Sequence, residues 1–273
     1  MGNDTDLRVW FGLKRTPFSP DLKPEQLFLR PCMEEIRQRL TFAVRSSLYF
    51  AIIGDVGAGK STALRYALSQ LPDKQFAVLP VIGGNWSFVE LLRQCMAGLG
   101  VFTRTTQQST MLRSIHESFG AIRENGRIPV VCIDEASLFQ QNAYNQLHLL
   151  SQQSLTDGYV VPVVMCGQES LFEHLRNPFC RPLMNRILDG FNLRGMSQDE
   201  TSRYIVHHVS TISGGSGDLF DEKAMIAVHQ GAAGIPRRIN ELCLLAMNDA
   251  MLRQQRTVSM ENVRTASRAW WEN

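Results

Sequence analysis

Between residues 32 and 193, hydrophobic and polar positions follow a pattern that predicts alternating strands and helices. Short apolar runs predict strands at about 48–53, 76–82, 129–134, 159–166 and 188–193. Apolar residues recurring every three to four positions predict helices at about 32–46, 60–70, 87–98, 108–124, 136–153 and 169–176. This alternation favours a parallel sheet with helices on both faces, and therefore an α/β fold.

No strand is predicted after residue 193. Ser197 and Glu200 have the spacing of a capping box, which predicts a helix to about residue 212. Ser87 and Glu90 form a similar pair before the helix at 87–98. A loop at 213–218 and two or three helices within 221–271 complete a helical segment. We therefore expect an N-terminal arm (1–31) that packs apolar residues onto the core, an α/β domain (32–195) and a small helical domain (196–273).

A glycine-rich segment at residues 54–61 fits the phosphate-loop pattern GxxxxGK[ST] and lies between a predicted strand and a predicted helix. The loop amides and the helix N-terminus suit phosphate oxygens. Lys60 can reach the β- and γ-phosphates, and the Ser61 hydroxyl can bind Mg²⁺. The flanking elements disfavour the alternative, a glycine-rich turn with a chance lysine. The residues expected to hold ATP here are Gly54, Asp55, Val56, Gly57, Ala58, Gly59, Lys60, Ser61 and Thr62.

A second motif, Asp134–Glu135, ends the apolar strand predicted at 129–134. Asp134 is expected to hold Mg²⁺ together with Ser61. Glu135 is expected to act as general base on the attacking water, which favours Mg²⁺-dependent ATP hydrolysis over nucleotide sensing. The alternative is that Asp134 only caps the next helix.

Composition narrows the class of protein further. The 273 residues are 44% hydrophobic and carry a net charge of +2, a value that neither requires nor excludes a nucleic-acid partner. No apolar run of about 18 residues is present, and the N-terminus is polar and acidic, so we expect a cytoplasmic protein with no membrane contact. Cys132 and Cys166 are expected to be reduced core thiols. The His207–His208 pair is expected on a helix surface rather than at a zinc site.

Further segments support a family resemblance. They are Phe11-Gly-Leu with Pro17-Phe18, Cys166-Gly-Gln-Glu-Ser-Leu171, Arg186-Ile187, and Gly234-Ile-Pro-Arg-Arg-Ile-Asn240. With the phosphate loop and the acidic motif, they resemble AAA+ ATPases of the ExeA type, which are related to transposition ATPases of the TniB/TnsC/Mu B kind. The resemblance implies a five-stranded sheet of order 5-1-4-3-2, a helical lid, and a homo-oligomer that is a ring or a helical filament.

The resemblance also implies roles for single residues. Gln168 would be the sensor that positions the attacking water, and Arg237 the lid arginine that contacts the nucleotide phosphates. Arg186 would be an arginine finger acting on a neighbouring subunit's ATP, with Arg181 as its rival. Two alternatives stay open: Gln168 as a helix cap, and Arg237 as a solvent-facing side chain.

ExeA-type secretion proteins continue into a membrane span and a cell-wall-binding domain, whereas this sequence stops at Asn273. We therefore expect an ATP-dependent regulator that binds duplex DNA non-specifically and recruits or activates a transposase. The alternative is an ExeA-type ATPase that assists assembly of a secretion or envelope complex. A nucleotide-gated scaffold without hydrolysis is a third interpretation, against which Glu135 argues.

Two segments are candidate DNA contacts. The first is the polar loop around Thr103, Arg104 and Thr105, whose hydroxyls and guanidinium suit phosphates without base readout. The second is the segment Phe139–Tyr144. Ordinary hydrophilic connections are the alternative for both. Trp270 and Trp271 are expected to pack on the lid or to contact a partner.

Overall fold

The structure is a computed structural model that describes residues 6–19, 22–151 and 160–271, the last three of these by backbone alone. Its internal contacts divide the chain into two units. The sheet unit comprises Pro31–Val56 and Lys60–Leu193. The helical unit comprises Met1–Arg30, Gly57–Gly59 and Arg194–Asn273, so the N-terminal arm belongs with the C-terminal helices.

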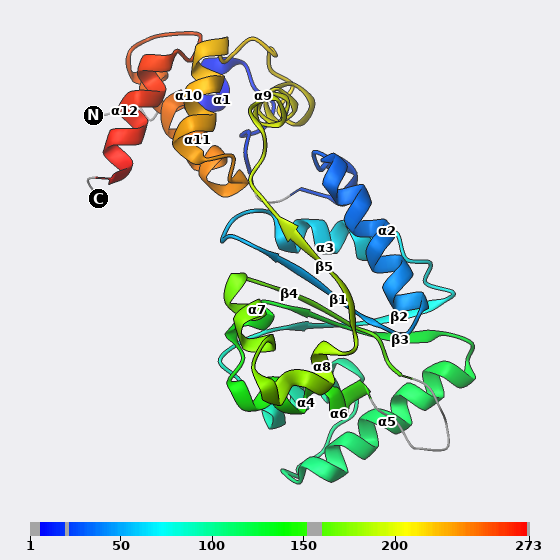
Figure 1. Cartoon of the computed structure of the whole chain (residues 1–273). Coiled ribbons are helices and arrows are strands. Elements are labelled where there is room, and N and C mark those ends of the chain that lie inside the picture. Colours follow the sequence, from blue (N-terminus) through cyan, green and yellow to red (C-terminus); the bar gives the residue numbers. More distant parts are fainter. Residues whose placement is uncertain (1–5, 20–21, 152–159, 272–273) are drawn as a thin grey trace. The chain divides into compact units, whose positions relative to one another are not determined.

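The sheet unit contains five parallel strands in the order β2-β3-β4-β1-β5 (Figure 1). The same order viewed from the other edge is 5-1-4-3-2, which confirms the predicted topology. The strands are β1 (Tyr49–Gly54), β2 (Phe76–Ile82), β3 (Ile128–Asp134), β4 (Val163–Gly167) and β5 (Ile187–Leu193).

Helices cover both faces of this sheet (Figure 1). On one face, Phe50 and Val164 pack with Ile36 and Leu40 of α2 and with residues of α3. On the other face, residues of the same strands pack with α4, α5 and α6. The side-chain alternation along each strand thus supplies two apolar layers. The helices are α2 (Pro31–Arg45), α3 (Lys60–Ser69), α4 (Phe88–Gly98), α5 (Gln108–Glu124), α6 (Gln141–Ser151), α7 (Glu169–Leu175) and α8 (Arg181–Met184).

Three sequence predictions about these elements need correction. The helix predicted at 136–153 is split into a 3₁₀ turn, η2 (Ala136–Leu138), and α6, because the extended residue Phe139 buries its ring against Trp86 and Tyr144. The strand predicted from 159 begins at Val163, directly after Pro162, which has no N–H to donate to a ladder. Residues 152–159 of these two predictions lie outside the described part of the chain.

The third correction concerns the predicted capping box at Ser87. Ser87 is the N-cap residue of α4, but its side chain makes no cap hydrogen bond. The carboxylate of Glu90 instead accepts from Arg93 and Gln94 on the same helix. By contrast, the predicted box of Ser197 and Glu200 is present with both of its hydrogen bonds.

The helical unit encloses its own apolar core, to which the N-terminal arm contributes Leu13 and Phe18. The C-terminal helices follow one another from the capping box, with a turn of π-helix after the first of them. The elements of this unit are α1 (Leu7–Phe11), η1 (Pro24–Gln26), α9 (Gln198–Val206), η4 (His207–Ile212), α10 (Glu222–Ala232), α11 (Pro236–Leu252) and α12 (Met260–Trp271).

His208 is buried within this core, so the prediction of a helix-surface histidine pair is wrong for it. The Nδ1 atom of His208 accepts from the backbone N–H of Phe18 at 3.2 Å, and the two rings stack with centroids 5.2 Å apart. Burial lowers the pKa of His208 to about 3 and keeps the imidazole neutral. The Nε2 atom of the neighbouring His207 donates to the Gln26 carbonyl at 2.9 Å. Both histidines therefore attach the arm to the helical unit.

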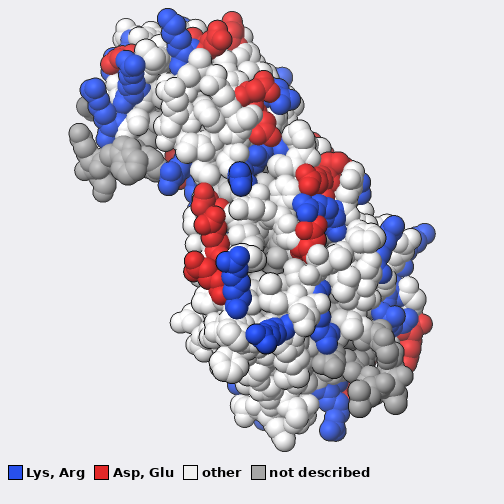
Figure 2. Space-filling model, viewed as in Figure 1, with Lys and Arg blue, Asp and Glu red and all other residues white. Residues whose placement is uncertain are grey.

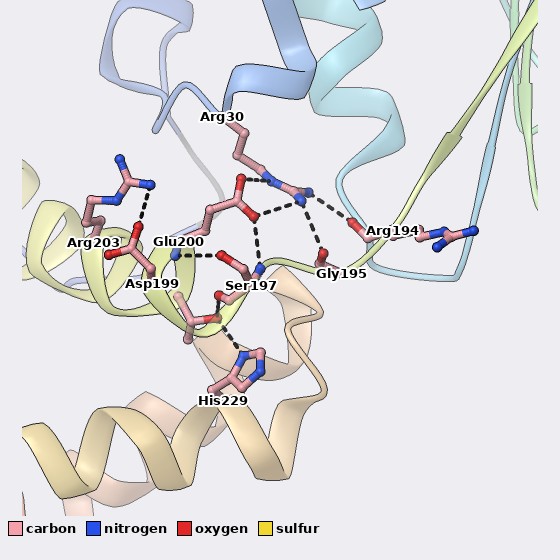
Figure 3. Close-up of polar contacts among 9 residues, drawn as sticks. Arg30, Arg194, Gly195, Ser197, Asp199, Glu200, Arg203 and His229 are labelled. Carbon is pink, nitrogen blue, oxygen red and sulfur yellow. Dashed lines mark hydrogen bonds and ion pairs between the residues drawn. The ribbon is translucent and has the colours of Figure 1, made fainter.

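Arg30, the last arm residue, is buried in the same unit and bonded to residues that follow β5 (Figure 3). Its guanidinium donates to the backbone carbonyls of Arg194 and Gly195 at 3.1 and 3.2 Å. It also donates to the carboxylate of Glu200 at 3.3 Å, the residue that completes the capping box of α9. One arginine thus links the end of the arm to the start of the helical C-terminal segment.

Candidate functional site

The carboxyl ends of β1, β3 and β4 meet at one edge of the sheet. Ile53 of β1 is paired with Gly167 of β4, and Met165 of β4 is paired with Ile133 of β3. The residues that end or follow these strands therefore gather at this edge, where open α/β sheets bind their ligands. Gly54, Asp134 and Gln168 are among them.

The phosphate loop connects β1 to α3 with the backbone geometry expected of it. Gly57 and Gly59 have φ values of 81° and 93°, in the left-handed region where a side chain is strained. The helix α3 begins at Lys60, so Ser61 and Thr62 lie in its first turn, where backbone N–H groups have no intrahelical acceptor. A helix N-terminus of this kind binds phosphate oxygens.

Lys60 is buried although it is charged, with 7% of its surface exposed. Its ammonium group donates to the carbonyls of Gly54 at 3.0 Å and Asp55 at 2.8 Å. These bonds hold the Nζ atom against the loop. A cation that binds a phosphate has to be held at such a place. The amide groups and this cation suit a nucleotide triphosphate, and the Ser61 hydroxyl and the Asp134 carboxylate are oxygen donors of the kind Mg²⁺ prefers. The residues present therefore fit both ATP and Mg²⁺.

Cys166, on β4, lies near two charged groups of the site, the Asp134 carboxylate and the Lys60 ammonium. Burial raises the pKa of its thiol, the hydrogen-bonded carboxylate of Asp134 raises it further, and the Lys60 ammonium partly opposes them. Burial also raises the pKa of Cys132 to about 12. Both cysteines are therefore protonated core thiols, as predicted from sequence.

Glu135 follows β3 with a left-handed backbone, at φ 53° and ψ 34°. This conformation is uncommon for a residue with a long side chain and costs about 1–2 kcal/mol. The Asp134 Oδ1 atom accepts from the Glu135 N–H at 2.9 Å, and Glu135 is itself the N-cap of η2. Asp134 therefore ends the strand without capping the next helical turn, which disfavours the alternative considered from sequence.

Gln168 is at the N-cap position of α7, but its side chain makes no cap hydrogen bond. Its backbone N–H donates to the hydroxyl of buried Ser137 at 3.2 Å. Ser137 belongs to η2, the turn that follows Glu135, so it links the turns after β3 and β4. Sequence reasoning missed Ser137, because nothing in its local pattern distinguishes it from a helix residue.

Arg186 is at the opposite end of the sheet from the phosphate loop. Its carbonyl accepts from Tyr49 N–H, and the paired strands run from Tyr49↔Ile187 to Gly54↔Leu193. The six residue steps of β5 span about 20 Å. A guanidinium of Arg186 donates to the Ser151 hydroxyl at 3.4 Å, next to the buried Tyr49–Ser151 hydrogen bond. Arg181, its rival, is exposed at the first position of α8.

Arg237 is exposed in the first turn of α11, after Pro236 at the first helical position. Its backbone N–H donates to the Gly57 carbonyl at 3.3 Å, and both residues belong to the helical unit. An added Cβ on Gly57 would lie 2.8 Å from the Cβ of Arg237. Glycine at position 57 is therefore required both by its φ and by this close approach.

The candidate DNA loop lies between α4 and α5 and is exposed. Thr103 and Thr105 accept the N–H groups of Thr105 and Gln107 at 3.2 and 3.1 Å, so two local turns shape the loop. Phe102 is 89% exposed, and Arg104 is exposed beside it. The face seen in Figure 2 carries Lys and Arg next to Asp and Glu, in keeping with the small net charge.

The other candidate contacts are restricted by burial or lie outside the description. Phe139 and Tyr144 are buried in the sheet unit, so these two side chains are excluded from a DNA surface and the prediction is wrong for them. The side chains of Trp270 and Trp271 lie outside the described residues. Within the described residues, no group of three or more His, Cys, Asp or Glu side chains is placed to hold a metal ion. None of the described helices is both long and apolar enough to cross a membrane.

Residues 44–175 match the family described as AAA domain. This part of the chain is therefore similar to AAA domains. The fold agrees: the crystal structure of Cdc6p from Pyrobaculum aerophilum is similar with a TM-score of 0.72 and 16% identity, over 92% of this chain and 70% of that one. The structure of Drosophila ORC bound to DNA has a TM-score of 0.65 and 18% identity, over 97% and 68% of the two chains. The chain thus has the same fold as these proteins.

A curated relative is similar over most of the chain. General secretion pathway protein A of Aeromonas hydrophila is 27% identical over 246 residues, which are 89% of this chain and 45% of that protein. The chain therefore spans less than half the length of this relative. The match supports the predicted resemblance to the ExeA type.

Proposed function

We propose that this chain hydrolyses ATP and is an oligomeric switch whose active site is completed by a neighbouring copy. The observation that carries the proposal is the position of Arg186. The length of strand β5, about 20 Å, separates this residue from the end of the sheet that carries the phosphate loop of its own chain. An arginine finger at this position acts only on the nucleotide of another subunit. An arginine finger typically contributes about 10³–10⁵ in rate.

Within one copy, the proposed division of labour follows the geometry of the sheet edge. Lys60 and the amides at the start of α3 bind the β- and γ-phosphates. Mg²⁺, held by Ser61 and Asp134, supplies charge stabilisation at the phosphate oxygens. Glu135 takes a proton from the attacking water, and Gln168 orients that water. Arg237 contacts the nucleotide phosphates and reports their state to the helical unit.

We propose further that the ATP-loaded assembly binds duplex DNA without sequence preference. The exposed loop with Thr103, Arg104 and Thr105 offers hydroxyls and one guanidinium per copy, which suit phosphate contacts. The likeness to an ORC structure bound to DNA is in keeping with this proposal. With few cations per copy, affinity has to come from many copies along one duplex, so binding is cooperative and salt-sensitive. The resemblance to transposition ATPases makes a transposase the proposed partner, recruited or activated at target DNA.

The second candidate function is assistance in assembling a secretion or envelope complex. The 27% identity with general secretion pathway protein A over 89% of this chain favours it. In this case the ATPase cycle acts on a protein partner, and the loop around Arg104 has no DNA to contact.

Fluorescence anisotropy of labelled duplexes separates the two candidates. The titration is made with ATP, ADP and no nucleotide, each at two salt concentrations. Cooperative binding that requires ATP and weakens with salt supports the DNA-binding switch. No binding with ATP at low salt favours the secretion candidate, and binding that ignores nucleotide contradicts the switch.

A further inference from the structure

Gly83 directly follows β2 and touches the backbone of the acidic motif at the end of β3. Its N–H donates to the carbonyl of Asp134 at 2.6 Å, extending the pairing of the two strands by one residue. The parallel register of β2 and β3 creates this contact. It therefore cannot be recognised from the phosphate loop or the acidic motif in the sequence.

The approach at Gly83 leaves no room for a side chain. A Cβ built on Gly83 would lie 2.4 Å from the carbonyl oxygen of Glu135, 2.8 Å from its carbonyl carbon and 2.9 Å from the Asp134 oxygen. All three atoms are backbone, so none can rotate away as the end of a side chain can. They belong to the two peptide groups on either side of the Glu135 Cα. Any residue other than glycine at position 83 therefore has to displace the backbone that carries the Glu135 side chain.

The backbone at Glu135 needs external support, since its φ of 53° is unfavourable for a residue with a side chain. The Asp134 carboxylate supports it on one side by accepting the Glu135 N–H. Downstream, the hydroxyl of buried Tyr144 donates to the Ala136 carbonyl at 2.5 Å. Gly83 packs against the remaining side. The direction of the Cα–Cβ bond, and with it the place of the carboxylate, depends on all three contacts.

We infer that Gly83 is a positioning residue for Glu135: the close packing of its backbone holds the general base in its left-handed conformation, aimed at the attacking water. The inference rests on the proposed role of Glu135 as the base. The inference gives Gly83, at the end of β2, a role in hydrolysis, although this residue lies outside both the phosphate loop and the acidic motif.

The test compares Gly83→Ala with Gly190→Ala, a glycine on β5 where an added Cβ would meet only ordinary contacts, 3.6 Å from the Ala51 oxygen. We expect Gly83→Ala to bind a labelled ATP analogue within about twofold of wild type and to lower the single-turnover rate by about 10–100-fold. Gly190→Ala is expected to match wild type in both. Thermal unfolding midpoints confirm that each variant is folded at the assay temperature.

Two more variants show whether the loss acts through Glu135. In the Glu135→Gln background, Gly83→Ala is expected to cause no additional loss of turnover, because the group it positions is already absent. Tyr144→Phe loosens the same turn from the other side with little change in volume. It is expected to lower turnover without weakening nucleotide affinity, and it carries the test should Gly83→Ala unfold.

Turnover of Gly83→Ala at the wild-type rate overturns the inference, as does a further loss when it is added to Glu135→Gln. A parallel loss of nucleotide affinity also overturns it, because that result indicates general damage to the site. Wild-type turnover by Glu135→Gln alone contradicts the proposed base itself, and this outcome is visible before Gly83 is considered.

Discussion

Arg30 and Glu200 form an ion pair across 170 residues of sequence, with 3.3 Å between Arg30 Nε and Glu200 Oε1. Both side chains are largely withdrawn from solvent, at 9% and 16% exposure. Glu200 also accepts the Ser197 N–H at 2.9 Å (Figure 3). The same carboxylate therefore caps α9 and binds Arg30 at the end of the N-terminal arm. Removing it leaves the buried guanidinium without its counter-charge and the Ser197 N–H without its acceptor.

This pair predicts a pH dependence of the helical unit. Burial alone would raise the pKa of Glu200, but the Ser197 N–H and the Arg30 guanidinium outweigh it and hold that pKa below its ordinary value. A carboxyl with a lowered folded-state pKa adds stability above its unfolded pKa and loses it as the pH falls through the folded value. Glu200→Gln should therefore speed amide exchange in residues 22–30 and 194–206 at pH 7. The difference from wild type should shrink as the pH falls below the ordinary glutamate pKa of about 4.3, whereas exposed Glu222→Gln should leave exchange unchanged over the same pH range.

Lys60→Ala is expected to weaken ATP binding. The variant removes the ammonium that the Gly54 and Asp55 carbonyls hold at the loop, and we expect affinity to fall by at least about tenfold, or about 1.4 kcal/mol. A labelled ATP analogue in an anisotropy titration measures it, with exposed Lys74→Ala as the matched control. Unchanged affinity in Lys60→Ala would contradict the phosphate-loop assignment.

Mixing variants tests the active site between copies. Arg186→Ala alone should lose nearly all turnover and keep its ATP affinity, because the arginine is at the far end of the strands. Adding Lys60→Ala protein should restore part of the activity, since an intact arginine can then face an intact phosphate loop. Steady-state ATPase assays over a range of mixing ratios measure the rescue. The same mixture with Arg181→Ala in place of Arg186→Ala decides between the two arginines, and no rescue in either series would argue against a finger from a neighbouring copy.

Arg104→Ala is expected to weaken DNA binding in the presence of ATP about equally for all duplex sequences, because phosphate contacts carry no base information. The slope of log affinity against log salt should become shallower, by about one counterion for each Arg104 that contacts a phosphate. Arg65→Ala, an exposed arginine on α3, is the control. If the loss depends on the base sequence, Arg104 reads bases and the non-specific proposal is wrong.

The sequence predicted the glycine-rich and the acidic motif because their chemistry depends on residues adjacent in the chain, whereas the sheet order was implied by the family resemblance. Gly54, Lys60 and Asp134 are placed by a strand and the turn that follows it. The same reasoning failed where a distant residue decides a local structure. Ser87 and Ser197 have the same spacing to a glutamate, but Arg93 and Gln94 bond Glu90 within its own helix, whereas Arg30 supports the box at Glu200.

Burial explains the other differences. Phe139 interrupts a segment with helical periodicity because its ring is required between Trp86 and Tyr144. His208 looks like a surface residue in sequence, yet it accepts the N–H of Phe18, 190 residues earlier. Gly83 could be noticed as one of two glycines after a predicted strand, but its function depends on the register of β2 against β3. Contacts of this kind are set by tertiary packing, which a single sequence does not display.

The left-handed backbone of Glu135 has a consequence for the evolution and engineering of this chain. A glycine there would relieve a strain of about 1 kcal/mol, so, under the proposed role of Glu135 as general base, the residue best for folding is not the residue that hydrolysis needs. With Glu135 as the base, the chain would trade stability for activity at this position. Selection for thermal resistance alone would favour glycine at this position and yield a sturdier protein that holds nucleotide without turning it over. Designs based on this scaffold should therefore screen for turnover as well as for melting temperature.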